Sequence, residues 1–363
     1  MASPKGTSKV YFIKASAGDG EELISKKARK LFKAGGFASR FKENDFTAVK
    51  VHVGEKGNNT HLKAQYIKGL LDELLKLKTK PFLTDASVLY ISQRRNSIDH
   101  TILAAKHGFS FKKLAVPFIV ADGLLGTSET KVTINGEINK EVFIASDIAR
   151  CQSILSVAHF TGHLGACFGA TLKTLGMGCA SKRGKLQQHS GITLSIGDGC
   201  VLCGECFKHC PADAITLGSI KAHIDREKCI GCAECLAVCK FGAVECNWGA
   251  EGEVLQKSIA EHAMGALKEK QDRAVFFNFI MSVTKDCDCF DRPNMPKIVE
   301  DIGIAASTDP VAVDKAGLDL IEDRADRKMA DLIDNNELNP LYQIQHAERI
   351  GLGSAAYELV EIG

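Results

Sequence analysis

Cysteine is the residue type whose spacing points most directly to chemistry in this chain. Eight of the 14 cysteines fall between Cys200 and Cys239, in a segment that repeats itself. The first copy reads CVLCGECFKHCPADAITL and the second CIGCAECLAVCKFGAVEC, and each opens with Cys-x2-Cys-x2-Cys-x3-Cys. Clustered thiolates ligate zinc or iron-sulfur clusters. Because the duplicated unit is too small to bury a hydrophobic core of its own, we expect bound metal to hold it folded.

The spacing resembles that of the two-cluster bacterial ferredoxins. In that pattern three thiolates hold three corners of a 4Fe-4S cubane, and the fourth cysteine of each run ligates the other cluster. Zinc ribbons, the rival interpretation, usually show two separated Cys-x2-Cys pairs. Lys240 stands where the second copy would normally have proline, which removes no ligand. The predicted ligands are Cys200, Cys203, Cys206 and Cys239 for one cluster, and Cys229, Cys232, Cys235 and Cys210 for the other.

A glycine-rich stretch, residues 158–190, precedes this window and is the second candidate for chemistry. His159, His163 and Cys167 stand four residues apart, so on a helix they would share one face and could ligate a metal, although the glycines between them disfavour a regular helix. The stretch could instead form a substrate or cofactor pocket with His163, Lys173 and His189. A packed glycine-rich turn is the third interpretation.

A third candidate, TKDCDCFDRPNMP (284–296), follows the dense apolar run Ala274–Val283. Loops at the carboxyl ends of parallel strands bind ligands in α/β domains, which favours a functional role. The Cys-x-Cys sequence could be a redox thiol pair, a metal-binding pair or simply two loop cysteines. The candidate catalytic residues from this loop and the preceding stretch are His163, Lys173, Lys285, Cys287, Asp288 and Cys289.

Four other features receive ordinary structural interpretations. Asp309 is expected to cap a helix that begins at Pro310. The loop 53–61 matches no phosphate-binding fingerprint and is interpreted as a plain connection, and SKRGK (181–185) as a solvated basic loop. Cys151 and Cys246 are expected to pack as small apolar side chains.

The rest of the chain alternates strand-like and helix-like stretches, which favours an α/β fold with a mostly parallel sheet and flanking helices. The predicted strands are Thr47–Val53, Lys80–Asp85, Phe118–Asp122, Glu141–Ala145 and Ala274–Val283. The predicted helices are His61–Leu77 capped by Thr60, Ser97–His107 closed by Gly108, and Asp309–Ile321, whereas Ile148–Val157 is ambiguous. Neither flank looks complete alone. We therefore expect one discontinuous α/β domain, 1–190 and 250–363, interrupted by a small α+β ferredoxin-like domain at 191–249.

Composition excludes several classes of protein. The chain is 45% hydrophobic and 25% charged, as in globular proteins, and its net charge of +2 gives no electrostatic case for binding nucleic acid or an anionic membrane. The clustered cysteines, the absence of an apolar signal segment and the absence of a long apolar run favour a cytoplasmic protein with reduced thiols.

Motifs in the flanks resemble the domain-of-unknown-function family 362, whose members often carry a two-cluster ferredoxin module. These motifs are GATLKTLGMGC (169–179), KDCDC (285–289) and DIGIAASTDPVAVDKAGLDLI (301–321). The resemblance implies a cytoplasmic iron-sulfur protein whose flanks form a single domain, and it supplies no catalytic residue.

Two functions remain open at this point. In the first, the clusters pass electrons to a small-molecule substrate held near Lys173, His163 and the 285–289 loop, with His163 or Asp288 as general acid. In the second, the protein is a non-catalytic electron carrier or adaptor that docks to a separate redox partner protein. The large flanking domain favours the first.

Overall fold

The computed structural model describes residues 6–189, 193–247 and 252–363. Its centre is an eight-stranded sheet in the order β16-β1-β15-β14-β7-β2-β3-β4. From β14 to β4 every pairing is parallel, whereas β15 runs antiparallel to both of its neighbours. The predicted α/β fold with a mostly parallel sheet is confirmed. In sheet order the strands are Tyr357–Glu361, Ser8–Lys14, Gly303–Ser307, Ala274–Ile280, Ser153–His159, Phe46–Lys50, Lys80–Asp85 and Phe118–Val120.

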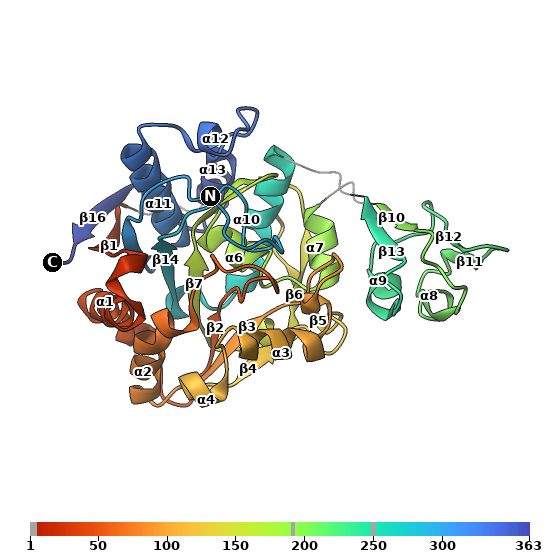
Figure 1. The fold of residues 1–363 in the computed structure, drawn as a ribbon, viewed down its shortest axis with the longest axis horizontal. Coiled ribbons are helices and arrows are strands. Elements are labelled where there is room, and N and C mark those ends of the chain that lie inside the picture. The colour runs from red at the N-terminus through yellow and green to blue at the C-terminus, as the bar shows by residue number, and fades with distance from the viewer. Residues whose placement is uncertain (1–5, 190–192, 248–251) are drawn as a thin grey trace.

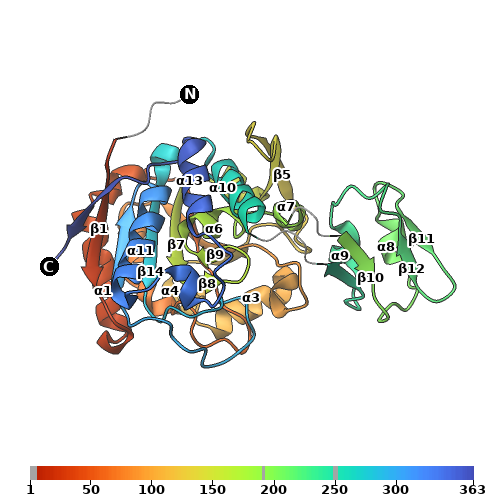
Figure 2. The same cartoon turned by 90° about the horizontal axis from the view of Figure 1, so that it is seen from above.

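Helices cover both faces of the sheet (Figures 1 and 2). The apolar run of β14 is buried along its whole length, and successive side chains alternate between two cores, with Phe276 in one and Phe277 in the other. The first core packs against α6 (Thr171–Gly176), α10 (Glu253–Leu267), α11 (Pro310–Ala325) and α13 (Leu341–Arg349). The second packs against α1 (Glu21–Ala34), α2 (Lys68–Lys76) and α3 (Ser97–Lys106).

Most predicted elements exist, with shifted ends. Strand β3 has the predicted bounds, and the cap of α11 is as predicted, since Asp309 accepts hydrogen bonds from the backbone N–H groups of Val311 and Ala312. The predicted helix His61–Leu77 is wrong at its start. There the Asn58 side chain, rather than that of Thr60, accepts the backbone N–H groups of Thr60 and His61. A 3-10 turn at Ala64–Ile67 then precedes α2.

Two predicted segments take other roles. Glu141–Ala145 is a strand, β6, but it pairs antiparallel with β5 (Glu129–Thr133) outside the main sheet. The ambiguous stretch 148–157 divides between α5 (Ser146–Arg150) and β7. The remaining short elements of the body are α4 (Phe111–Leu114), β8 (Thr161–His163), β9 (Cys167–Gly169), α7 (Lys182–Gln188) and α12 (Met329–Leu332).

The cysteine-rich insertion forms a separate lobe, which we call the module (residues 193–247; Figures 1 and 2). Two antiparallel strand pairs, β10–β13 and β11–β12, enclose the short helices α8 and α9 around a small apolar core. The predicted domain boundaries at 190/191 and 249/250 lie outside the described residues. The bounds are Thr193–Ile196 (β10), Glu205–Lys208 (α8), Ile215–Leu217 (β11), Ala222–Ile224 (β12), Glu234–Val238 (α9) and Val244–Asn247 (β13).

The sequence repeat is also a structural repeat. In each copy the residue after the second cysteine, Gly204 or Ala233, has a left-handed backbone conformation with φ of 76° or 63° and starts a short helix. Each helix then carries the third cysteine of its run. In the described part of the chain, no helix is long and apolar enough to cross a membrane.

Candidate functional site

The module contains two small cavities that are lined by cysteines. One is lined by Cys200, Cys203, Cys206 and Cys239, and the other by Cys210, Cys229, Cys232 and Cys235. The fourth cysteine of each run therefore lies with the triplet of the other run, which is the crossed arrangement that the spacing predicts. Four thiol donors around each cavity, backed by aliphatic side chains, fit a 4Fe-4S cubane.

A larger cavity of about 440 Å³ lies in the α/β body. It opens at the carboxyl ends of the neighbouring parallel strands β3, β2 and β7 and at the loop after β14, the location where parallel sheets bind ligands. The two predicted segments, 158–190 and 284–296, both contribute to its wall. Polar lining residues include Lys50, His52, Asp85, Tyr90, Arg94, His159, His163, Lys173, Lys185, His189, Cys287, Asp288 and Cys289.

Glycines let these two segments approach each other closely. A Cβ atom on Gly162 would lie 2.1 Å from the backbone oxygen of Lys285, and the Gly162 N–H donates a hydrogen bond of 2.8 Å to the carbonyl of Thr284. A Cβ on Gly169 would lie 2.7 Å from Cδ of Lys173. Residues 161–169 of the glycine-rich stretch therefore form a tight hairpin, β8–β9, beside the cavity rather than a helix.

Lys173 reaches the cavity from α6, and a buried carboxylate fixes the start of that helix. Asp314 of α11 accepts the backbone N–H groups of Thr171 and Leu172 at 2.8 and 2.7 Å and the side-chain amide of Asn278 at 2.7 Å. Burial raises the pKa of Asp314 to about 7. For Lys173, burial lowers the pKa of the ammonium, but the neighbouring Cys287 and Cys289 raise it above its usual value.

Cys287 and Cys289 both face the cavity from a turn in which the N–H of Phe290 donates to the carbonyl of Cys287 at 3.1 Å. Interaction between the two side chains raises the pKa of Cys287 and lowers that of Cys289 well below its usual range. Nε2 of His52 lies 3.7 Å from the Cys289 sulfur, and Lys173 stabilises the same charge. The pair therefore holds one thiol and one thiolate.

His159 and Asp288 form a buried pair between β7 and this turn. His159 Nδ1 lies 2.8 Å from Asp288 Oδ2, and Nε2 lies 2.8 Å from the carbonyl of Met281. Both ring nitrogens face acceptors, so both carry protons and the ring is an imidazolium. Burial opposes this charge, but Asp288 raises the pKa of His159, and His159 in turn holds the pKa of Asp288 below its usual value against the effect of burial.

The structure corrects the prediction that His163 or Asp288 is a general acid. Nδ1 of His163 accepts the backbone N–H groups of Gly165 and Ala166, so its proton lies on Nε2. Burial, followed by Lys173, lowers the pKa of His163 well below its usual value, so the ring is neutral. Asp288 is a carboxylate. Of the candidate catalytic residues, Lys173 carries an ionisable proton as an ammonium and Cys287 carries one as a thiol.

The structure contradicts the prediction for Lys285 and one of the alternatives for the glycine-rich stretch. Lys285 points to the surface, where it pairs with Asp334 at 2.8 Å, and it does not line the cavity. His159, His163 and Cys167 do not share a helix face, since they lie on β7, β8 and β9 and Cys167 is fully buried. Within the described residues, these three side chains belong to no group of His, Cys, Asp or Glu that could hold a single metal ion.

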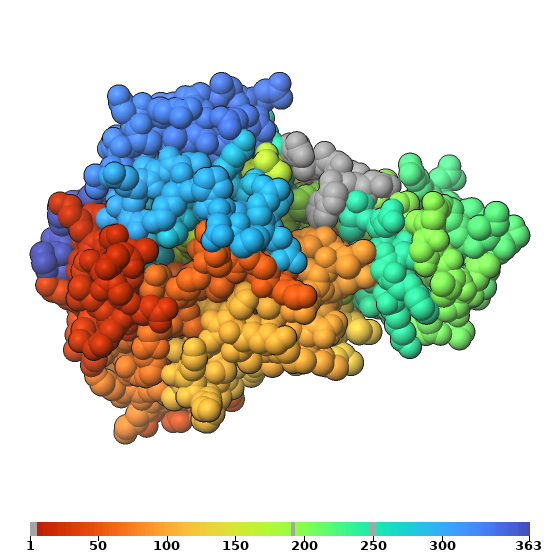
Figure 3. Space-filling model, viewed as in Figure 1, coloured from red at the N-terminus to blue at the C-terminus, as the bar shows by residue number. Residues whose placement is uncertain are grey.

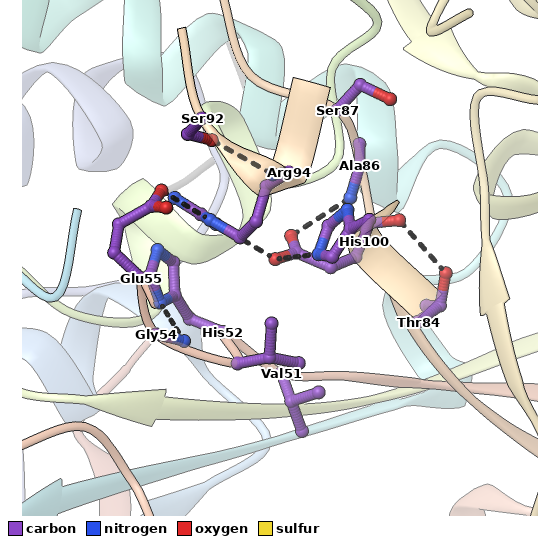
Figure 4. Close-up of polar contacts among 12 residues, drawn as sticks. Val51, His52, Gly54, Glu55, Thr84, Ala86, Ser87, Ser92, Arg94 and His100 are labelled. Atoms are coloured by element: carbon purple, nitrogen blue, oxygen red, sulfur yellow. Dashed lines mark hydrogen bonds and ion pairs between the residues drawn. The ribbon is translucent and has the colours of Figure 1, made fainter. Parts of the chain in front are cut away.

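Sequence reasoning missed a network of charged residues at the ends of β2 and β3. Lys50 lies 2.9 Å from Asp85, and both side chains are buried. Arg94 donates to Glu55 at 2.7 Å and to Asp85 at 3.2 Å, and Tyr90 donates to Glu55 at 2.7 Å. Figure 4 shows the Arg94 guanidinium directed at Glu55, with His52 beside it. The loop 53–61 is therefore more than a plain connection. The available signal was a Lys and an Asp at the ends of otherwise apolar strands.

The prediction of a solvated basic loop at 181–185 is also wrong. Ser181 caps α7 by accepting the N–H of Gly184, and the side chains of Lys182 and Lys185 are buried. Burial lowers the pKa of each of these lysines to about 8. Lys185 lines the cavity. The basic residues of this segment suggested exposure to solvent, but Lys182 and Lys185 are buried because α7 packs against β6 and α10.

The remaining cysteines have packing roles. Cys151, Cys167 and Cys179 are buried in the core of the body, and Cys246 lies half-buried against the core of the module. The expectation for Cys151 is confirmed. Cys246 is less buried than predicted.

One segment, residues 86–95, connects the cavity to the module. Val88, Leu89, Tyr90 and Arg94 line the cavity, while Leu89 also belongs to the apolar core of the module. Arg95 donates a hydrogen bond of 2.6 Å to the carbonyl of Leu236 in α9. Figure 3 shows the module as a lobe against the orange part of the body, which includes this segment.

An α/β body with a cavity at the strand ends and an inserted ferredoxin-like segment defines an iron-sulfur protein with an electron-transfer module. The chain belongs to the family described as "Domain of unknown function (DUF362)", whose model matches residues 47–319. This match confirms the resemblance of the flanking motifs to family 362.

Known proteins match the cysteine-rich middle region. One of them is a subunit of the ion-translocating oxidoreductase complex of Methanosarcina acetivorans, 47% identical over 47 residues, which is 13% of this chain and 18% of that protein. The chain is 28% identical over 86 residues to the electron transport protein HydN of Escherichia coli K12, or 23% of this chain and 45% of HydN. A probable iron-sulfur subunit from the Frd operon of Proteus vulgaris is 26% identical over 138 residues, which is 37% of this chain and 76% of that protein. The chain thus spans less than half the length of the first two.

Among solved structures, the chain is similar to the lactate racemase apoprotein of Thermoanaerobacterium thermosaccharolyticum. The TM-score is 0.41 and the sequence identity 14%, over 75% of this chain and 50% of that protein.

Proposed function

We propose that the protein is an iron-sulfur oxidoreductase in which two 4Fe-4S clusters of the module deliver electrons to a small-molecule ligand in the cavity of the body. The observation that carries this proposal is the segment 86–95, because Leu89 lines the cavity and also packs in the apolar core of the module, and the nearby Arg95 donates a hydrogen bond to Leu236 of the module. A module that served only an outside partner would not need its contact surface to be part of a cavity wall.

The eight cysteines would hold the clusters in the two crossed sets. Bound clusters supply one-electron transfer, at potentials that depend on their hydrogen bonds and exposure. The backbone N–H of Ala214 donates to the Cys210 sulfur at 3.3 Å, which would stabilise negative charge on that ligand. Arg95 brings a guanidinium near Cys239 and would do the same for the other cluster.

The cavity residues would bind and orient the ligand. Lys173 offers a charged donor, neutral His163 offers its Nε2–H, and the buried Oδ1 of Asp288 has no hydrogen-bond partner among the described residues and offers an acceptor. Burial of an unpaired carboxylate oxygen costs free energy unless a ligand donates to it. Leu89, Leu164 and other aliphatic side chains of the lining exclude water.

A second candidate function is that of an electron carrier that docks to a separate redox protein. Exposed apolar side chains on the module, Phe207, Ile220 and Phe241, favour it, because they could form a docking surface. A protein partner and a small-molecule substrate are both compatible with these features. We expect neither nucleic acid nor a membrane as partner.

One experiment separates these functions. Protein purified anaerobically is expected to contain about eight iron atoms per chain and to show visible absorption that bleaches on reduction. The reduced protein is then mixed with panels of small carbonyl and carboxylate acceptors. Reoxidation by one of them, slowed in Lys173→Met at unchanged iron content, supports the oxidoreductase. Reoxidation only by other redox proteins, at equal rates in the wild type and in Lys173→Met, supports the function of an electron carrier.

A further inference from the structure

Cys287 and Cys289 are placed for chemistry of their own. Both line the same cavity, and they stand only two residues apart in one turn. The residue between them is anchored, since Asp288 is held by His159 at 2.8 Å. The turn hydrogen bond from Phe290 to the carbonyl of Cys287 fixes the same backbone. The two sulfurs therefore stay together on one side of a rigid turn.

We propose that Cys287 and Cys289 form a reversible thiol–disulfide couple that exchanges two electrons with the clusters of the module. The inference rests on the proposed function for the source of the electrons. It assigns the cavity a protein-bound redox group, so that single electrons from the clusters are collected as a pair before they reach the ligand.

The surroundings of the pair support this reactivity. Thiol–disulfide chemistry needs a thiolate, and Cys289 is stabilised as one by the neighbouring Cys287 thiol, by Lys173 and by His52, whose Nε2 lies 3.7 Å away. Cys287 keeps its proton, because the adjacent thiolate and burial both raise its pKa. Cys151, Cys167 and Cys179 lie in the core without such neighbours, and burial raises the pKa of each of these thiols to about 11 or 12.

The reaction balances with the groups present. In the oxidised form a bond joins the two sulfurs. The disulfide would accept two electrons, one from each bound cluster, and its sulfur–sulfur bond would break. One proton would then bind to Cys287, and Cys289 would become a thiolate. The cavity lysine Lys173 neutralises the new charge and exchanges protons with water. Electron flow in the opposite direction reverses each step.

The position of the pair relative to the module fits this exchange. Tyr90 belongs to the segment 86–95 that touches the module, and it lies close enough to Cys287 and Cys289 for their charges to affect its pKa, which burial raises well above the usual value. The pair and the module thus lie on two sides of one short segment.

The first test does not depend on the clusters. The full-length protein is equilibrated anaerobically in dithiothreitol redox buffers, alkylated and analysed by mass spectrometry. We expect the peptide with Cys287 and Cys289 to change from two alkylated thiols to an internal disulfide at a defined buffer potential. Both thiols staying alkylatable in every buffer, or a metal that co-purifies on them, would overturn the inference.

The second test connects the pair to the clusters. In an anaerobic reductive titration, the oxidised wild type is expected to take up two more electrons per chain than Cys287→Ser or Cys289→Ser, whereas the control Cys151→Ser behaves as wild type. Equal uptake by all four proteins contradicts the inference. Missing cluster absorption contradicts the proposed function instead, and the redox-buffer result then stands separately, so the two failures are distinguishable.

Discussion

His159 and Asp288 form an ion pair across the cavity wall, 129 residues apart in sequence and 2.8 Å apart in space. One partner ends strand β7, and the other lies between the two cavity cysteines. Because the carbonyl of Met281 occupies the second ring nitrogen, the pair has one protonation state at neutral pH. The contact holds the loop after β14 against the parallel sheet, so both the stability and the geometry of the cavity depend on it.

Replacement Asp288→Asn is therefore expected to lower the free energy of unfolding by about 3 kcal/mol, because it leaves a buried imidazolium without its partner. The neighbouring Asp286→Asn, outside the cavity lining, is the control. Urea unfolding at neutral pH measures both variants. An equal stability of the two would show that the pair does not hold the loop.

The same ion pair predicts how the stability of the folded protein depends on pH. The raised pKa of His159 means that its contribution to stability is fully present below the ordinary value of 6.5 and is lost as the pH rises through the raised value. The lowered pKa of Asp288 means that its contribution is present above 3.8 and is lost as the pH falls through the lowered value. The difference in melting temperature between the wild type and Asp288→Asn should therefore be largest at pH values between the pKa of Asp288 and that of His159. Melting curves of both proteins across this pH range measure it.

The crossed cysteine sets predict the outcome of paired substitutions. Cys203→Ala with Cys239→Ala removes two ligands of one cluster and should leave about four iron atoms, whereas Cys232→Ala with Cys239→Ala disrupts both clusters and should leave almost none. Iron analysis and electron paramagnetic resonance measure the result, and Cys246→Ala is the control that keeps the full content. The reverse order of the two double variants would contradict crossed ligation.

Gly162→Ala is predicted to destabilise the protein by about 1–3 kcal/mol, because the new Cβ would lie 2.1 Å from the Lys285 oxygen and 2.7 Å from Cγ2 of Ile333. Gly18→Ala is a matched control, since its Cβ would meet only the Ser16 Oγ at 3.6 Å. Thermal unfolding of both variants, with alkylation rates of Cys289 as a local probe, checks the prediction. A Gly162→Ala protein as stable as Gly18→Ala would rule out the tight packing of the two segments.

The buried lysines of α7 predict stability that rises at alkaline pH. The pKa of Lys182 and of Lys185 is about 8 in the folded protein, against 10.5 for an ordinary lysine, so the unfolded chain binds more protons between these values. Replacing both lysines by Met should remove their contribution to the increase in the free energy of unfolding with pH. Urea unfolding across this range measures it, with the exposed Lys140→Met as control. A similar slope in the double variant and in wild type would refute the burial of these charges.

Local sequence determined the features that depend on neighbours along the chain. The spacing of the cysteines predicted the two triplets, because short loops keep three sulfurs of one run together, and the resemblance to two-cluster ferredoxins implied the crossed place of each fourth cysteine. Strand β3 and the Asp309 cap of α11 were predictable for the same reason, since an alternating pattern or a capping side chain acts within a few residues. The position of the cavity at the strand ends followed from the parallel sheet.

Only the tertiary structure decided which side chains face that cavity. Lys285 and Cys287 are two residues apart, yet one pairs with Asp334 at the surface and the other is buried. The basic run 181–185 looked solvated, and Lys182 is buried because α7 packs against the body. Arg94, in a 3-10 turn, contacts Glu55 of the loop after β2 and Asp85 at the end of β3. Burial and charge pairing depend on contacts between distant segments, and these contacts exist only once the sheet has brought the strand ends together.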